Sequence, residues 1–127
     1  MANAQAIGHA IPDEALVITK AVVNAAERLG LNARILADVI GVSEATVSRM
    51  KRRDHLLERH SKPFELAVLF VRLFRSLDAI VGGDEAVARQ WLRNPNLAFS
   101  ATPLEKITSI SGLTDVLAYL DARRALV

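Results

Sequence analysis

Residues 36–52 read LADVIGVSEATVSRMKR and place one glycine, Gly41, between two segments of helical pattern. Glycine adopts the left-handed backbone conformation that commonly ends a helix. Ser43, two residues later, is among the residue types preferred at the N-cap of a helix. The stretch therefore predicts a short helix, a sharp turn and a second short helix.

The two predicted helices carry the small and apolar residues that a helix-turn-helix requires. Two short helices that cross steeply need a small residue at the crossing, which Ala37 supplies, and apolar contacts between them. Because these positions agree in register, the pattern is far more specific than a lone glycine between helices. The apolar positions are Leu36, Ile40, Val42, Val47 and Met50.

The second of these helices presents a polar and basic face opposite Val47 and Met50. Ser43 and Thr46 bring hydroxyls to the helix start, where unpaired amide groups favour a phosphate. Arg49 is the candidate for two parallel hydrogen bonds to a guanine in the major groove. The predicted DNA-contacting residues are Ser43, Glu44, Ala45, Thr46, Ser48, Arg49, Lys51, Arg52 and Arg53.

Charge is distributed unevenly along the chain, although the formal net charge is only +2. Residues 28–62 hold eight basic side chains against four acidic ones, whereas residues 63–127 hold seven of each. A basic excess alone is equally typical of a solvated surface. Its coincidence with the predicted turn favours duplex DNA as a partner, with Lys51, Arg52 and Arg53 on the phosphate backbone.

Two alternatives to a DNA-binding helix remain open from the sequence. The segment can be a helical hairpin whose outer surface is merely polar. It can also be a helix-turn-helix that contacts protein, and Glu44 favours this because a carboxylate at the helix start is repelled by phosphates. The same carboxylate can instead accept a hydrogen bond from cytosine N4.

Apolar residues three and four positions apart predict further helices on both sides of the motif. Asn32 is placed to cap the helix before Gly41, Gly82-Gly83 ends a long apolar helix, and Gly112 separates the last two. No strand-like alternation is present, so we expect an all-α fold with a helix-turn-helix domain over 1–62 and a C-terminal helical domain over 63–127. The predicted helices span about 13–29, 33–40, 44–53, 63–81, 84–93, 102–109 and 113–125. The charged residues 52–62 form either a loop or an exposed helix end.

The sequence offers no catalytic or metal-binding constellation. The chain has no cysteine, which removes disulfides, thiolate metal ligands and cysteine nucleophiles. His9, His55 and His60 do not share a helix face, and Ser48 has no histidine base near it. We expect neither an enzyme nor a cofactor nor a metal site.

Membrane and export signals are also missing from the pattern. No apolar run approaches the ~20 residues that cross a bilayer. Residues 1–14 lack the basic start and apolar middle of a signal peptide. The sequence therefore predicts a cytoplasmic protein without a membrane segment.

Residues 89–127 read RQWLRNPNLAFSATPLEKITSISGLTDVLAYLDARRALV. Together with the upstream helix-turn-helix, this segment resembles the Xre/MbcA/ParS antitoxins, which are partners of RES-domain toxins. The resemblance runs from about residue 16 to residue 124. Family members often have a glycine-containing loop where this chain has Ser100-Ala101. The motifs that carry the resemblance are Trp91-Leu92, Pro95-Asn96, Thr102-Pro103-Leu104, Gly112, Val116 and Tyr119-Leu120.

The resemblance implies a function for each half of the chain. It implies a Cro/CI-type DNA-binding domain that represses the antitoxin's own operon, and a C-terminal domain that covers the cleft through which NAD reaches the toxin. Trp, Tyr and Arg are common interface anchors, but Trp91 and Phe99 can instead fill the core between short helices, and the core is the favoured place for Trp91. The residues expected to contact the toxin are Tyr119, Arg123, Arg124 and Trp91.

One recognition helix makes few contacts with DNA, so a homodimer that reads two half-sites is expected. The alternative function is that of a stand-alone helix-turn-helix repressor without a toxin partner. A third possibility is an adaptor that binds only protein.

Overall fold

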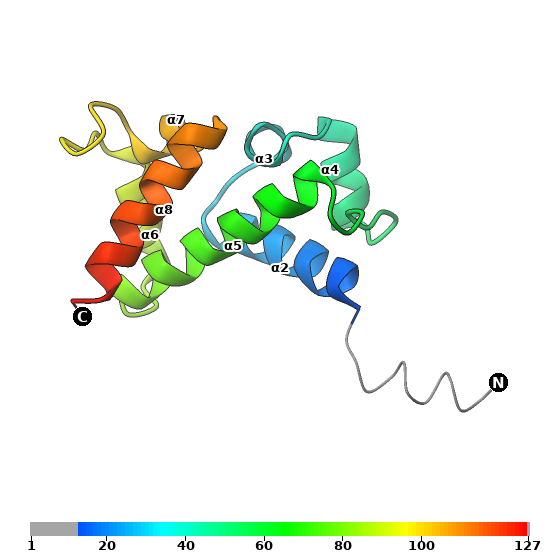
Figure 1. Ribbon diagram of the computed structural model, residues 1–127, viewed down its shortest axis with the longest axis horizontal. Coiled ribbons are helices and arrows are strands. Elements are labelled where there is room, and N and C mark those ends of the chain that lie inside the picture. The colour runs from blue at the N-terminus through cyan, green and yellow to red at the C-terminus, as the bar shows by residue number, and fades with distance from the viewer. Residues whose placement is uncertain (1–12, 127) are drawn as a thin grey trace.

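The computed structural model describes residues 13–126, which fold into seven α-helices with one isolated β-bridge and no β-strand (Figure 1). The all-α fold predicted from the sequence is confirmed. The helices are α2 (Glu14–Arg28), α3 (Ala33–Ile40), α4 (Glu44–Lys51), α5 (Lys62–Ile80), α6 (Glu85–Arg93), α7 (Pro103–Lys106) and α8 (Ile110–Arg124).

Helices α3 and α4 form the predicted helix-turn-helix. Asn32 caps α3 by accepting from the amide of Ile35 at 2.9 Å, and Ser43 caps α4 by accepting from the amide of Thr46 at 3.0 Å. Gly41 ends α3 with φ of 75°, in the left-handed region. These three short-range expectations are confirmed, and together they explain why the chain stops one helix and restarts the next within three residues.

Helix α5 holds the molecule together. It packs against α2 and α3 on one side and against α8 on the other. Figure 1 shows α2, α3 and α4 gathered at one end of the molecule, α6, α7 and α8 at the other, and α5 running between them. The side chains of Phe70, Leu73 and Leu77 on α5 are fully buried in a single apolar cluster that extends into both ends.

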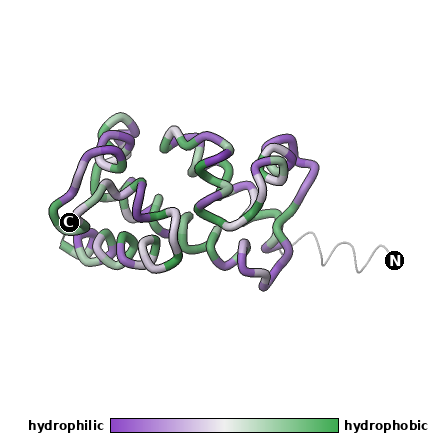
Figure 2. Tube along the Cα trace, turned by 90° about the horizontal axis from the view of Figure 1, so that it is seen from above, coloured by the Kyte–Doolittle hydropathy of each residue, from purple (hydrophilic) through white to green (hydrophobic). Residues whose placement is uncertain are grey.

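Hydrophobic and hydrophilic residues alternate along the helices, as amphipathic helices around a shared core require (Figure 2).

Residues 52–61, which the sequence left open as loop or helix end, form a loop. Leu57 is buried in this loop, and its amide donates to the hydroxyl of the buried Thr19 on α2 at 3.0 Å. The loop is therefore fixed against the first helix.

No helix among the described residues combines the length and apolarity needed to cross a bilayer.

The ends of three helices differ from the sequence-based expectations. Helix α4 stops at Lys51, because Arg53 adopts a positive φ of 65° that does not continue a helix. Helix α7 is a single turn that ends at Lys106.

The largest difference concerns Gly112, which lies inside α8 rather than before it. Ser109 caps α8 by accepting from the Gly112 amide at 3.1 Å, so the helix begins at Ile110. A Cβ atom at Gly112 would collide with the backbone carbonyl of Lys106. The glycine is needed because α7 and α8 approach closely here. The prediction from the sequence that a helix boundary lies at Gly112 is therefore wrong.

Candidate nucleic-acid and partner interfaces

The outer face of α4 is accessible to a partner. Val47 and Met50 are 0% and 3% exposed and fix the inner face of the helix against the core. The later helices α6 to α8 lie at the other end of the molecule and do not cover α4 (Figure 1). Of the predicted DNA-contacting residues, Thr46 and Ser48 are half-buried, whereas the exposed ones are Ser43, Glu44, Ala45, Arg49, Lys51, Arg52 and Arg53.

A hydrogen-bonded network orders the side chains at the start of α4. The hydroxyl of Ser43 donates to the hydroxyl oxygen of Thr46 at 2.9 Å, and Nη2 of Arg49 donates to the same oxygen at 3.2 Å. The Thr46 hydroxyl thus accepts two hydrogen bonds and keeps its own proton to donate to a partner. This arrangement holds Arg49 along the outer edge of the helix.

The three cations that follow Arg49 are less tightly held. Nε of Arg52 lies 3.4 Å from a carboxylate oxygen of Asp54, and both side chains are 62% exposed. An ion pair this exposed contributes about 0–1 kcal/mol, so Asp54 does not prevent Arg52 from pairing with another anion.

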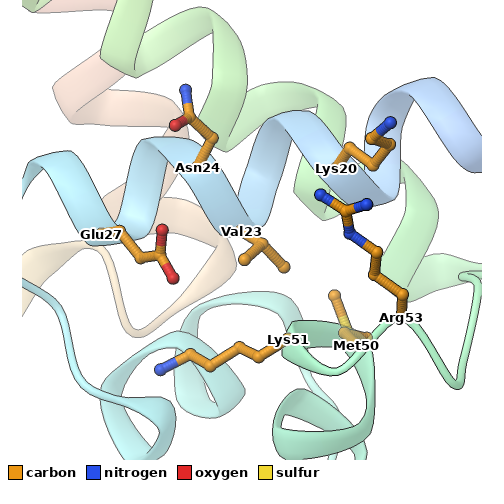
Figure 3. Close-up of a pocket in the computed structure, with 7 residues that line it drawn as sticks. All are labelled: Lys20, Val23, Asn24, Glu27, Met50, Lys51 and Arg53. Atoms are coloured by element: carbon orange, nitrogen blue, oxygen red, sulfur yellow. The ribbon is translucent and has the colours of Figure 1, made fainter.

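Lys51 and Arg53 line an open pocket of about 380 Å³ between α2 and the end of α4. Figure 3 shows the guanidinium of Arg53 at the same end of this pocket as the ammonium of Lys20, with Lys51 and Glu27 toward the other end. Val23 and Met50 supply apolar lining. Sequence analysis missed Lys20, because only the packing of α2 on α4 brings it beside the cations of the recognition helix.

The second candidate interface is an aromatic cluster between α6, the following loop and α8. The rings of Trp91 and Tyr119 are stacked with centroids 6.2 Å apart, and Phe99 meets them edge-on at 6.4 and 5.1 Å. The three side chains are half-buried. The cluster therefore packs its own rings together and still leaves part of each side chain at the surface.

The two arginines at the end of α8 make different contacts. The guanidinium of Arg123 lies 5.4 Å from the centroid of the Tyr119 ring and donates to the Tyr119 hydroxyl at 3.2 Å. Arg124 instead points toward α5, with Nη1 3.4 Å from the hydroxyl of Ser76. The structure thus brings together Trp91, Tyr119 and Arg123 and places Arg124 apart from them.

Comparison with protein families divides the chain into two matches. Residues 11–72 match the antitoxin Xre-like helix-turn-helix domain, and residues 76–125 match the antitoxin Xre/MbcA/ParS C-terminal toxin-binding domain. The chain belongs to the Xre/MbcA/ParS family of antitoxins. The family predicted from the sequence is confirmed, as is its non-enzymatic nature. Comparison with curated proteins yields no match.

In this antitoxin the two halves are joined by arginines of α6. Arg89 donates to the carbonyl oxygens of Arg28 and Glu27 at 2.8 and 3.3 Å, and Arg93 donates to those of Leu29 and Gly30 at 3.1 and 2.9 Å. The toxin-binding domain therefore supplies donors for carbonyl groups at and just beyond the C-terminal end of α2. No short-range sequence signal indicates this contact.

Arg28 reinforces the junction in the opposite direction. Its Nε donates to a carboxylate oxygen of Glu85 on α6 at 2.7 Å, and its guanidinium lies 4.9 Å from the centroid of the Phe74 ring. The hydrogen bond to Glu85 raises the pKa of Arg28, whose guanidinium is charged throughout the physiological range in any case.

The antitoxin has no cluster of three or more metal-ligating side chains within residues 13–126. Of the histidines weighed as ligands, His9 lies outside the described residues.

Proposed function

We propose that this antitoxin acts in the cytoplasm, represses its own operon through the outer face of α4 and neutralises a RES-domain toxin through its C-terminal domain. The observation that carries the proposal is the separation of the two candidate interfaces. The recognition helix lies at one end of the long axis and the loop between α6 and α7 at the other (Figure 1). One chain can therefore hold DNA and toxin at the same time.

The DNA-binding half of the proposal rests on the chemistry of the α4 surface. The helix N-terminus enters the major groove, where Arg49 reads a guanine and the Thr46 hydroxyl donates to a phosphate. Lys51 and Arg53, together with Lys20, then flank the groove and pair with the phosphate backbone. Glu44 faces a cytosine amino group rather than a phosphate.

A homodimer is part of the same proposal. A single eight-residue recognition helix presents too few base contacts for tight specific binding. Two copies that read half-sites one helical turn apart, about 34–36 Å, double the contacts and make the operator palindromic.

The toxin-binding half assigns contacts to the aromatic cluster and its neighbours. Tyr119, Arg123 and Trp91 share one surface, and Arg124 follows at the end of α8. A ring with a cation held over it provides the aromatic and guanidinium groups that dominate binding energies at protein interfaces. Covering the toxin's NAD cleft blocks catalysis without any chemical step in the antitoxin.

The decisive experiment expresses the product of the neighbouring gene with and without this antitoxin. We expect growth arrest and loss of cellular NAD when the neighbour is expressed alone, and recovery of both when the antitoxin is present. A gel shift on the DNA upstream of the gene pair is expected to show retardation at low salt. Retardation without rescue would instead identify a stand-alone repressor, and rescue without retardation would remove the DNA-binding half.

A further inference from the structure

The loop between α6 and α7 contains a tight hairpin that the proposed contacts do not use. The amide of Asn96 donates to the carbonyl of Ala101 at 3.0 Å, and the carbonyl of Asn96 accepts from the amides of Phe99 and Ser100 at 3.0 and 3.1 Å. The side chain of Asn96 accepts from the amide of Ala98 at 2.9 Å. The backbone of this hairpin is therefore held in one conformation.

Leu97 stands at the tip of the hairpin with its side chain fully in solvent. Its exposed fraction is 102%, the highest of the large apolar side chains of the described residues. The hairpin does not need a leucine there, because the side chain contributes nothing to the core. An apolar group presented on an ordered backbone loses little conformational freedom when a partner binds it.

The segment around Leu97 lacks charge. Residues 94–104, NPNLAFSATPL, contain no charged side chain, although 24% of the whole chain is charged. Depletion of charge is what distinguishes the core of a protein interface from its rim and from ordinary surface. In the sequence, Arg93 and Glu105 border the segment on either side.

The hairpin also has a shape suited to docking. A hollow of about 410 Å³ lies beside Leu97, between the hairpin and the start of α7, and Pro95, Ala101 and Thr102 help to line it. A projecting apolar side chain next to a hollow provides both halves of a complementary surface, one that enters a partner and one that receives it.

Phe99 connects this surface to the rest of the toxin-binding domain. Its ring packs edge-on against Trp91 and Tyr119, so the turn of the hairpin is anchored on the aromatic cluster. The hairpin also lies within residues 76–125, the toxin-binding match.

We propose that Leu97 is the apolar anchor of the toxin interface and inserts into an uncharged pocket on the toxin, with the aromatic cluster as its support. This inference rests on the proposed function.

The test compares Leu97→Asp with Leu56→Asp. Leu56 is also an exposed leucine, 42% exposed, in the loop after α4, so it controls for loss of surface hydrophobicity. Each variant is titrated against the purified product of the neighbouring gene by isothermal calorimetry, after circular dichroism has shown that its melting is unchanged. We expect Leu97→Asp to lower the affinity at least about 100-fold, because a carboxylate would enter an apolar pocket unpaired.

A second variant, Leu97→Ala, removes only apolar surface and is expected to weaken binding about tenfold. Leu56→Asp is expected to bind as the parent does. Parent-like affinity of Leu97→Asp would overturn the inference and leave the proposed function intact. A parent protein that does not bind the neighbour would overturn both. A change in oligomeric state of Leu97→Asp, measured by light scattering without toxin, would assign the hairpin to a second copy of this chain instead.

Discussion

The guanidinium of Arg93 on α6 donates to the carbonyl oxygen of Gly30 beyond the end of α2, with an Nη2–O distance of 2.9 Å. Nη1 of the same side chain donates to the carbonyl of Leu29 at 3.1 Å. A planar guanidinium can satisfy two carbonyls at once, and its charge is favourable at the negative end of a helix. The toxin-binding domain therefore fixes the first helix of the DNA-binding domain in position.

Replacing Arg93 by alanine is expected to destabilise the whole protein rather than one domain. Three charge-assisted hydrogen bonds to backbone carbonyls are lost, two at the end of α2 and one to Arg89 within α6, and because the side chain is exposed we expect about 1–2 kcal/mol in the free energy of unfolding. Urea denaturation followed by circular dichroism measures this. Arg75→Ala is the control, since Arg75 is an exposed arginine on α5 whose side chain makes no hydrogen bond within the described residues. Equal stability of the two variants would show that the contact between α6 and α2 does not hold the domains together.

Gly112→Ala is expected to destabilise the protein although alanine is the better helix former. Helix propensity alone favours alanine by about 1 kcal/mol. The added Cβ would meet the carbonyl of Lys106 and lie 2.9 Å from the hydroxyl of Ser109, and a backbone carbonyl cannot move aside as a flexible side chain can. We expect a net loss of about 1–3 kcal/mol, measured by thermal melting. Ser111→Ala, one residue earlier and exposed, is the control and is expected to melt as the parent does. If Gly112→Ala were more stable than the parent, the close approach of α7 and α8 would be disproved.

The features that the sequence predicted correctly are local ones. Asn32 and Ser43 cap helices that begin one residue later, and each bond reaches only three residues along the chain. The requirement at Gly112 and the bonds of Arg93 depend instead on which helices pack together. A glycine between two segments of helical pattern looks the same in the sequence whether it ends a helix or makes room for a neighbouring helix.

The candidate sites show the same division. The outer face of α4 follows from helical periodicity once Val47 and Met50 are recognised as buried. Lys20 joins this surface from a helix that begins 30 residues earlier in the chain, and no spacing rule connects the two. Leu97 lies in a loop without periodicity, so its exposure is visible only in the folded hairpin.

Lys20→Ala is expected to weaken DNA binding without changing sequence preference. Lys20 lines the pocket with Lys51 and Arg53, beside the recognition helix, where a cation pairs with phosphate rather than with a base. Affinity for operator and for random duplex is expected to fall by the same factor, and the slope of log affinity against log salt to decrease by about 1. Fluorescence anisotropy over a range of salt concentrations measures both. Arg75→Ala removes the same charge from the second half of α5, so an equal loss in that variant would attribute the effect to net charge.

Arg49→Lys separates base recognition from simple charge. Lysine keeps the positive charge but cannot form two parallel hydrogen bonds to a guanine, and it loses the guanidinium geometry that reaches Thr46 at 3.2 Å. We expect affinity for random duplex to stay within about twofold of the parent, and affinity for the operator to fall by about 1–3 kcal/mol. Arg49→Ala is expected to lose affinity for both the operator and random duplex. Competition binding with a labelled operator and unlabelled random DNA measures the ratio. If Arg49→Lys lost affinity for both DNAs equally, Arg49 would be a phosphate contact, and the readout of bases would have to come from Glu44, Ala45 and Ser48 instead.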